Sequence, residues 1–512
     1  MDNFKRRKRI GNIGLTLGIA IFLLFIFGTN LLHFNYKMNA DIASEVVLAE
    51  LIWKSGQIVP ESWYVSSEAR IISTPNLASL FYGLTDNMTL AFGLGCCFMT
   101  IFIVVSILFF CRKAGLNKTE TALFAFLGLA FFTNINILEL LYLFAGYYAI
   151  HVIALFFTLG LYAQSIKNKR ISWLGTAISL VWALCLGMQG MRGILVLYGP
   201  LFGTEVVRNI YHIYCKRSNY KSDWIISVWT CALLAISFIG TRFPFSVGQN
   251  ISRNIRKGIY KLFSAVIPDM YSAAGFKYTN ILGKICLVIF LLITLFLLID
   301  VVLRMFRKRE VEVVEWSFLV MCFSIIVPAI MVAFTTVEST ERYYFLLFYA
   351  MAFAVVLMWR KIGNRWKALV GILITIFSLI NIQNIYLPIL KQEEPPETEL
   401  YAVGEYLADN NYLRAYSTFD NANTITVLMN GKIRVSSVAS VDKMDVCKWL
   451  SSKSWYVPNV PFKERTAYII PEVMMDEFER FLEEHGKEVK FDTKIGSYLI
   501  YISDYNFSQL GE

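Results

Sequence analysis

The sequence of 512 residues lacks the cysteine and histidine patterns of disulfide-bonded or zinc-binding proteins. It has nine cysteines and four histidines, but no CxxC pair and no Cys/His spacing that suits a metal site. All cysteines except Cys447 lie in or beside apolar runs, where we expect them to pack as small buried hydrophobic residues. The sequence therefore predicts neither a disulfide framework nor a zinc site.

The sequence also lacks internal repeats, low-complexity tracts and a basic face suited to nucleic acid. Its net charge is +10, but the basic residues cluster at the ends of apolar runs, as they do in membrane proteins. The hydrophobic fraction is 56% and the mean hydropathy is +0.53, above the range of soluble domains. Apolar runs near the ~20 residues that cross a bilayer predict a polytopic helical membrane protein.

No cleavage site for a signal peptidase follows the first apolar run. The basic residues 5–9 precede the run 13–32, which is too long for the core of a signal peptide. We therefore expect a retained first helix with its basic end in the cytoplasm.

Eleven apolar runs predict about eleven transmembrane helices in the cell membrane. They cover residues 12–32, 88–111, 120–137, 146–165, 173–191, 193–213, 224–241, 280–303, 316–337, 343–360 and 368–388. Basic clusters follow at residues 112–118, 167–170, 216–221, 304–309 and 360–367. With the N-terminus inside, every cluster falls on the cytoplasmic side, which agrees with the positive-inside rule.

Three long segments then fall on the outer face: 33–87, the basic segment 242–279, and the region after the linker Glu393–Pro396. In the last region, strand-like runs at 467–470 and 498–502 flank a helix-like stretch at 473–485. The predicted domains are a transmembrane domain, residues 1–390, which includes the outer segments 33–87 and 242–279, and an extracytoplasmic α/β domain, residues 391–512.

The first outer loop carries a helix pattern directly after the first apolar run. Apolar side chains at helical spacing predict a helix along the membrane surface, namely Ile42, Val46, Ala49 and Trp53. Asp41 lies in its first turn, and Glu45 follows one turn later on the same side. Spacing leaves two roles open for Asp41: chemistry at the membrane surface, or a charge that the helix dipole favours at a helix start.

The stretch Asp41–Glu45 and the turn Ser55-Gly56 followed by Pro60 resemble the first-loop motif of the GT-C membrane glycosyltransferases. That superfamily includes aminoarabinose and protein-mannosyl transferases. In it, an acid just beyond the first transmembrane helix begins a juxtamembrane helix that ends in a small-Gly-x-x-x-Pro turn. The architecture is similar as well, with many helices, a large first outer loop and a soluble C-terminal domain.

The resemblance implies an inverting sugar transfer at the outer face. The donor would be a polyprenyl-phosphate-linked sugar, and the acceptor a glycan, lipid or polymer of the cell envelope. Asp41 matches the acid that acts as general base, and Glu45 is a weaker auxiliary candidate.

A lipid-phosphate leaving group needs cations, and the first candidate is Arg192 at the outer junction of two predicted helices. It either binds the phosphate or pairs with a neighbouring carbonyl or acid. A second source is the outer segment 242–279, where Arg253, Arg256 and Lys257 share one helix face. These residues either bind the donor or contact anionic headgroups in general.

The third candidate cation is Arg342, in the outer turn 338–344, which either contacts the donor or pairs with Glu338. In the turn 133–139, where family members place a second acid, only Glu139 is available as an auxiliary acid. No DxD or ExD pair occurs there. This departure puts a divalent metal in doubt as a cofactor, and we assign no metal ligands.

A second class of function fits the composition: a non-catalytic transporter or assembly factor for lipid-linked glycans. A transporter is expected to place ionisable groups in mid-membrane on helices broken by Gly or Pro. Here the notable charges lie near the outer ends of the predicted helices, which favours the enzyme.

Overall fold

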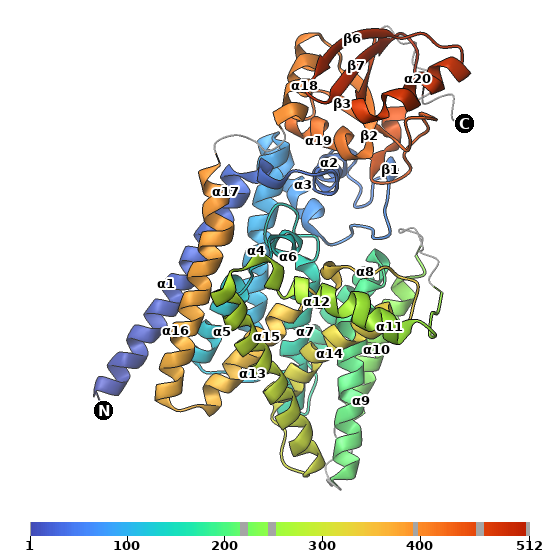
Figure 1. Ribbon diagram of the computed structural model, residues 1–512. Coiled ribbons are helices and arrows are strands. Elements are labelled where there is room, and N and C mark those ends of the chain that lie inside the picture. Colours follow the sequence, from blue (N-terminus) through green and yellow to red (C-terminus); the bar gives the residue numbers. More distant parts are fainter. Residues whose placement is uncertain (1, 216–223, 244–251, 393–397, 457–464, 508–512) are drawn as a thin grey trace. The chain divides into compact units, whose positions relative to one another are not determined.

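The computed structural model describes residues 2–215, 224–243, 252–392, 398–456 and 465–507 (Figure 1). The chain divides into two compact units. The first comprises residues 1–29, 97–244 and 248–390, and the second comprises residues 30–96, 245–247 and 391–512. By compactness, the first outer loop therefore groups with the C-terminal region, whereas the domains predicted from the sequence place residues 33–87 with the transmembrane helices.

The first unit is helical. Its helices are α1 (Asp2–Leu32), α4 (Met88–Ala114), α5 (Lys118–Ala130), α6 (Ile135–Leu141), α7 (Ala149–Asn168), α8 (Trp173–Gln189), α9 (Gly199–Tyr214), α10 (Trp224–Gly240), α11 (Gly258–Lys261), α12 (Ile267–Ala273), α13 (Ile281–Phe306), α14 (Val313–Ala333), α15 (Leu347–Lys361), α16 (Asn364–Asn381) and α17 (Leu387–Lys391). The ends of α1, α4 and α17 extend into the second unit.

The predicted membrane class is confirmed, but the count of eleven spans is not. In the described part of the chain, seven helical segments are long and apolar enough to cross a membrane. Helices α5 and α6 make an eighth only if they count as one span, and they are bent by 115°. Helices α8 and α10 are apolar but shorter. The remaining predicted span, 193–213, is a π-helical turn, Ile194–Tyr198, that continues into α9.

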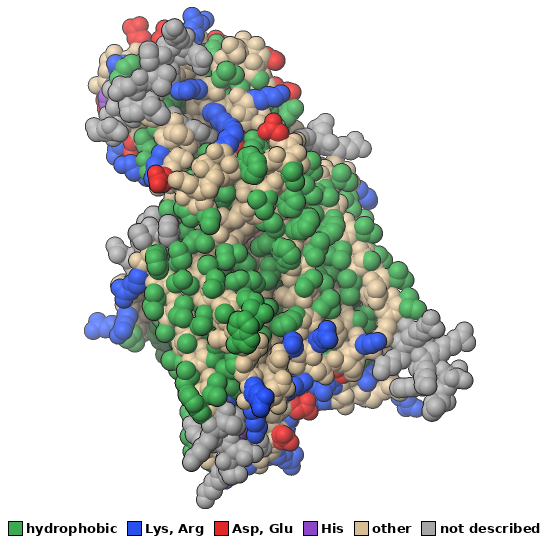
Figure 2. All heavy atoms as spheres, turned by 180° about the vertical axis from the view of Figure 1, so that it is seen from behind, with side chains coloured by type: hydrophobic (Ala, Val, Ile, Leu, Met, Phe, Trp, Pro, Cys, Tyr) green, Lys and Arg blue, Asp and Glu red, His purple; other side chains and the backbone are tan. Residues whose placement is uncertain are grey.

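Apolar side chains cover the outside of the helices of the first unit. Figure 2 shows one face, on which hydrophobic side chains are nearly continuous along the helices and charged side chains gather toward one end of them. Such a belt suits hydrocarbon, because no water is available there to solvate polar groups.

Ion pairs join several helices at one end of the first unit. Arg304 on α13 pairs with Glu315 on α14, and Lys361 on α15 pairs with Asp300 at 2.9 Å. Arg360, also on α15, lies 3.5 Å from Glu120 in the first turn of α5, so the start of α5 lies at this end as well. The basic clusters 112–118, 304–309 and 360–367 thus lie at helix ends that meet, as the positive-inside argument requires, while residues 216–221 lie outside the described residues. Which side of the membrane this end faces stays a prediction.

The second unit combines the first outer loop with an α/β fold. Its helices are α2 (Ala40–Ser55), α3 (Thr74–Thr85), α18 (Thr398–Asp409), α19 (Phe419–Leu428) and α20 (Met475–Glu484). Its strands are β1 (Trp63–Tyr64), β2 (Arg414–Thr418), β3 (Arg434–Val438), β4 (Ser451–Ser452), β5 (Thr466–Pro471), β6 (Lys490–Ile495) and β7 (Tyr498–Ser503). The five-stranded sheet has the order β3-β2-β5-β7-β6, with β2 parallel to both β3 and β5 and β7 antiparallel to its neighbours.

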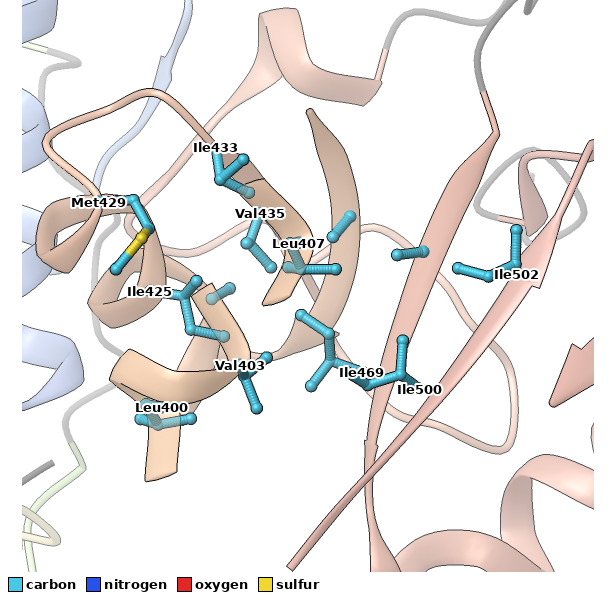
Figure 3. Packing of buried hydrophobic residues seen from close by; sticks show 13 residues of the cluster. Leu400, Val403, Leu407, Ile425, Met429, Ile433, Val435, Ile469, Ile500 and Ile502 are labelled. Atoms are coloured by element: carbon cyan, nitrogen blue, oxygen red, sulfur yellow. The ribbon is translucent and has the colours of Figure 1, made fainter. Parts of the chain in front are cut away.

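Alternating side chains of this sheet build two hydrophobic layers. Residues such as Ala415, Ile469 and Ile500 point to α18 and α19 (Figure 3). Their neighbours Tyr416, Tyr468 and Tyr501 belong to a second cluster that includes Phe478 of α20. This period of two is what a sheet covered on both faces requires. The α/β fold, both strands and the helix predicted for the C-terminal region are confirmed.

Candidate functional site

Helix α2 begins and ends where the sequence predicts. The side chain of Asn39 accepts a hydrogen bond from the amide of Ile42 at 2.9 Å and caps the helix start. Asp41 follows in the first turn, where the helix dipole favours a negative charge. Gly56 ends the helix with φ = 67°, a left-handed conformation that glycine adopts without strain.

Helix α2 is buried on almost every side within the second unit. The predicted apolar stripe is buried at Ile42, Val46 and Ala49, while Trp53 is exposed. The opposite side is buried as well, including the side chains of Glu45 and Glu50. The polar side chains of this helix therefore meet protein partners instead of water, and the placement of the helix along the membrane surface stays a prediction.

Glu45 is held in an ion pair. Both Nε and Nη2 of Arg70 lie 2.7 Å from Glu45 Oε1. The other oxygen, Oε2, is buried and has no hydrogen-bond partner among the described residues. Burial raises the pKa of Glu45, although the charge of Arg70 opposes the shift. This carboxyl is thus positioned by its own partner and closed to solvent.

Glu50 is held more tightly, by a cation from the C-terminal region. Nη1 of Arg434 donates to Glu50 Oε2 at 2.6 Å, and Nη2 donates to Oε1. Lys54 lies 2.6 Å from the same Oε1. Burial by itself raises the pKa of Glu50, but the hydrogen bonds and charges of Arg434 and Lys54 outweigh it, and the pKa is lowered.

Asp41 is the carboxylate of α2 that remains open. Its side chain is partly exposed, and none of the described residues pairs with it. The three acids of one helix are thus divided into two that are held by arginines and one, Asp41, that is partly exposed and has no ion pair among the described residues.

Further contacts fix α2 and its loop to the C-terminal region within the second unit. Nδ2 of Asn423, on α19, donates to Ser44 Oγ at 2.8 Å in a buried position. The strands β1 and β4 pair antiparallel, with Trp63 opposite Ser452. Sequence reasoning missed these partners, because Asn423 and Arg434 lie hundreds of positions from α2 and carry no motif.

In the first unit, Arg192 lies between two tyrosine rings. Its guanidinium carbon is 3.8 Å from the ring centroid of Tyr148, just before α7, and 5.5 Å from that of Tyr343. Contact with aromatic faces favours a cation at this position. The structure therefore joins Arg192 to the predicted turn 338–344.

That turn is anchored by Glu341, whose carboxylate accepts hydrogen bonds from several segments. Asn134 and Asn136, at the start of α6, donate to it at 3.1 and 2.7 Å. Ser272 of α12 and Tyr278 donate as well. The next residue, Arg342, is exposed. The sequence indicated the turn but not this hub, whose partners come from three separate segments.

The remaining predicted residues occupy different surroundings. Arg253, Arg256 and Lys257 are exposed, but they lie in an extended stretch and a turn before α11, so the helix face predicted for them is wrong. Glu139 is buried in α6. Asp41 and Glu45 belong to the second unit, and all the candidate cations and Glu139 belong to the first. Within the described residues, no group of three or more His, Cys, Asp and Glu side chains is placed to hold a metal ion.

The fold has counterparts among solved structures. No model of a known protein family matches the sequence, and no curated protein matches it. The apo structure of ArnT from Cupriavidus metallidurans is similar, with a TM-score of 0.57 and 10% sequence identity over 97% of this chain and 98% of that chain. The structure of the same protein bound to undecaprenyl phosphate has a TM-score of 0.58 and 10% identity over 95% and 97%. This likeness is one of fold: the chain shares the architecture of these two structures, in agreement with the fold that the resemblance of the first-loop motif predicts.

Proposed function

We propose that this protein is a membrane glycosyltransferase that moves a sugar from a polyprenyl-phosphate donor to an acceptor of the cell envelope, at the outer face. One observation carries the proposal: on the helix that resembles the family motif, Asp41 is the acid that is partly exposed and has no ion pair within the described part of the chain. The solved structure of similar fold that holds undecaprenyl phosphate supports a donor of this chemistry.

Asp41 acts as the general base. It accepts the proton of the acceptor hydroxyl while the hydroxyl oxygen forms a bond to the anomeric carbon of the sugar. The bond between that carbon and the phosphate oxygen breaks on the opposite side, so that the configuration inverts and polyprenyl phosphate leaves with the bonding electrons. Asp41 then carries the proton, which it loses to water.

The leaving phosphate gains negative charge and needs cations. Arg192 suits this role because it is a cation that Tyr148 and Tyr343 hold beside the turn 338–344. Arg342 follows the Glu341 hub and is exposed at the same turn. We include Arg253, Arg256 and Lys257 as weaker candidates, because they are exposed on the outer segment.

Glu45 is the less suitable base, although it lies one turn from Asp41. Its carboxyl is buried and bound to Arg70, so a hydroxyl substrate has no route to it without breaking that pair. We assign Glu45 a positioning role, in which it holds Arg70 against α2. Glu139, which is buried in α6, stays a predicted auxiliary acid.

The test compares envelope glycans by mass spectrometry in cells that lack this protein and in cells that regain it. Cells carrying the native sequence should regain a sugar modification that cells with Asp41→Asn do not. Glu61→Gln, an exposed acid of the same loop, is the matched control and should restore the product. Equal restoration by Asp41→Asn, at equal protein level in the membrane, would overturn the assignment of the base.

A further inference from the structure

Residues 252–257 form an extended stretch and a turn beside the end of α14, and residues 258–273 continue them as an irregular helical segment. The amide of Asn254 donates to Phe334 O at 2.9 Å, and the amide of Thr336 donates to Ser252 O at 3.0 Å. Lys261 turns inward, and its ammonium donates to the carbonyl of Thr335 at 2.9 Å. The segment is therefore fixed at the level where the apolar span of α14, which ends at Ala333, stops.

One side of this segment packs against the first unit. Gly258, Val266 and Ala273 are buried. A Cβ at position 258 would come within 2.2 Å of the Phe334 ring, so only glycine allows this close approach. The inner side is thus occupied by protein, and the segment has one face left.

The other side exposes large apolar side chains. Ile259, Tyr260 and Phe263 are 68%, 75% and 67% exposed, and Ile255 and Ile267 continue the same surface. A cluster of this kind is costly in water, and on a monomer it marks a site that contacts another phase or molecule. Beside it lie the exposed cations Arg253, Arg256 and Lys257.

We propose that residues 252–273 lie in the headgroup layer of the bilayer, with the apolar side chains in the acyl boundary and the three cations against phospholipid phosphates. An apolar face flanked by basic residues is the composition of helices that lie in a membrane interface. Helix α13, which is long and apolar enough to cross a membrane, begins eight residues after this segment, and its Ile281 and Ile285 are exposed as well.

This proposal does not depend on the transfer reaction. It concerns where the segment lies in the membrane, so it survives if Asp41 proves not to be a base. It also separates Lys261, which holds the end of α14, from the three cations that face outward.

Spin labels measure the surroundings of the segment in liposomes. The background replaces Cys185, Cys215 and Cys231, which are the cysteines that are not buried, by alanine. A nitroxide is then placed at Ile259→Cys or at Phe263→Cys. Phe296→Cys, on the exposed side of the α13 span, is the control for lipid, and Val473→Cys, which is 90% exposed in the second unit, is the control for water.

We expect labels at 259 and 263 to collide with oxygen more, and with a water-soluble nickel chelate less, than the label at 473. They should lie shallower than the label at 296. Nickel collisions equal to those at 473 would place the face in water and overturn the proposal. Low collision rates with both reagents would show that protein covers the face, such as a second copy of the chain, and would overturn it too.

The charges are tested separately in nanodiscs of phosphatidylcholine, with or without phosphatidylglycerol. Added phosphatidylglycerol should raise the melting temperature of the native protein, and a variant with Arg253, Arg256 and Lys257 all changed to Gln should lose this gain. The matched control changes three exposed lysines of the second unit to Gln, namely Lys432, Lys443 and Lys490, and should keep the gain. An equal gain in both variants would contradict the contact with phosphates.

Discussion

Arg434→Gln should destabilise the second unit, because it removes the main partner of a buried carboxylate. Glu50 is 1% exposed and Arg434 is 24% exposed. Removing one partner of a buried ion pair costs about 3–5 kcal/mol. Arg434 is partly solvated and Lys54 remains beside Glu50, so we expect a smaller loss than that range, about 2 kcal/mol.

The assay is thermal unfolding of the purified protein in detergent, followed by a probe of the second unit. A loss of that size corresponds to a fall in Tm of roughly 4–8 °C for a unit of this length. Lys432→Gln changes an exposed cation in the same turn and is the control, with a Tm within about 1 °C of the native value. Equal shifts in the two variants would refute the reasoning.

The same pair predicts a dependence on pH with a definite sign. The pKa of Glu50 is lowered in the folded protein, so its contribution is present above the unfolded pKa of about 4.3 and is lost as pH falls through the folded pKa. The Tm difference between native protein and Arg434→Gln should therefore be full at neutral pH and shrink below about pH 4.5. A difference that grows on acidification would contradict the ion pair.

Two further predictions concern the first unit. Glu341→Ala removes the carboxylate that accepts from Asn134, Asn136 and Ser272, and it should lower Tm by several degrees. Glu338→Ala, at an exposed position of the same turn, should leave Tm nearly unchanged. Equal Tm values would argue against the hub. Arg192→Lys keeps the charge but loses the planar stacking on Tyr148. The KM for a polyprenyl-phosphate sugar should therefore rise about 10-fold with Tm unchanged. An unchanged KM would remove Arg192 from the donor site.

Local patterns predicted the parts of the fold that depend on nearby residues. Helix α2 was predictable at both ends, because Asn39 and Gly56 satisfy backbone groups within one turn of themselves. The strands β5 and β7 follow from apolar alternation. Broken spans were not predictable, since hydropathy sums over residues 120–137 and does not register the 115° bend between α5 and α6.

The site was predictable only where one residue carries the signal. Asp41 stands out by its place after an apolar run. Glu45 follows one turn later on the same side and was predicted as a weaker auxiliary acid. Its ion pair with Arg70 was not predictable, because no local pattern connects Arg70 to α2. The Glu341 hub likewise depends on donors from three segments, and the brace of α2 depends on Asn423 and Arg434. Such pairings follow from packing in three dimensions and not from spacing.

The most direct measurement follows polyprenyl phosphate itself. Purified protein in liposomes receives polyprenyl-phosphate-linked sugars and an envelope extract as acceptor, and the release of free polyprenyl phosphate is measured for native protein and Asp41→Asn. General-base catalysis contributes about 10²–10⁴-fold, so release by Asp41→Asn should fall by about that factor at unchanged Tm. Release at the native rate would contradict the account.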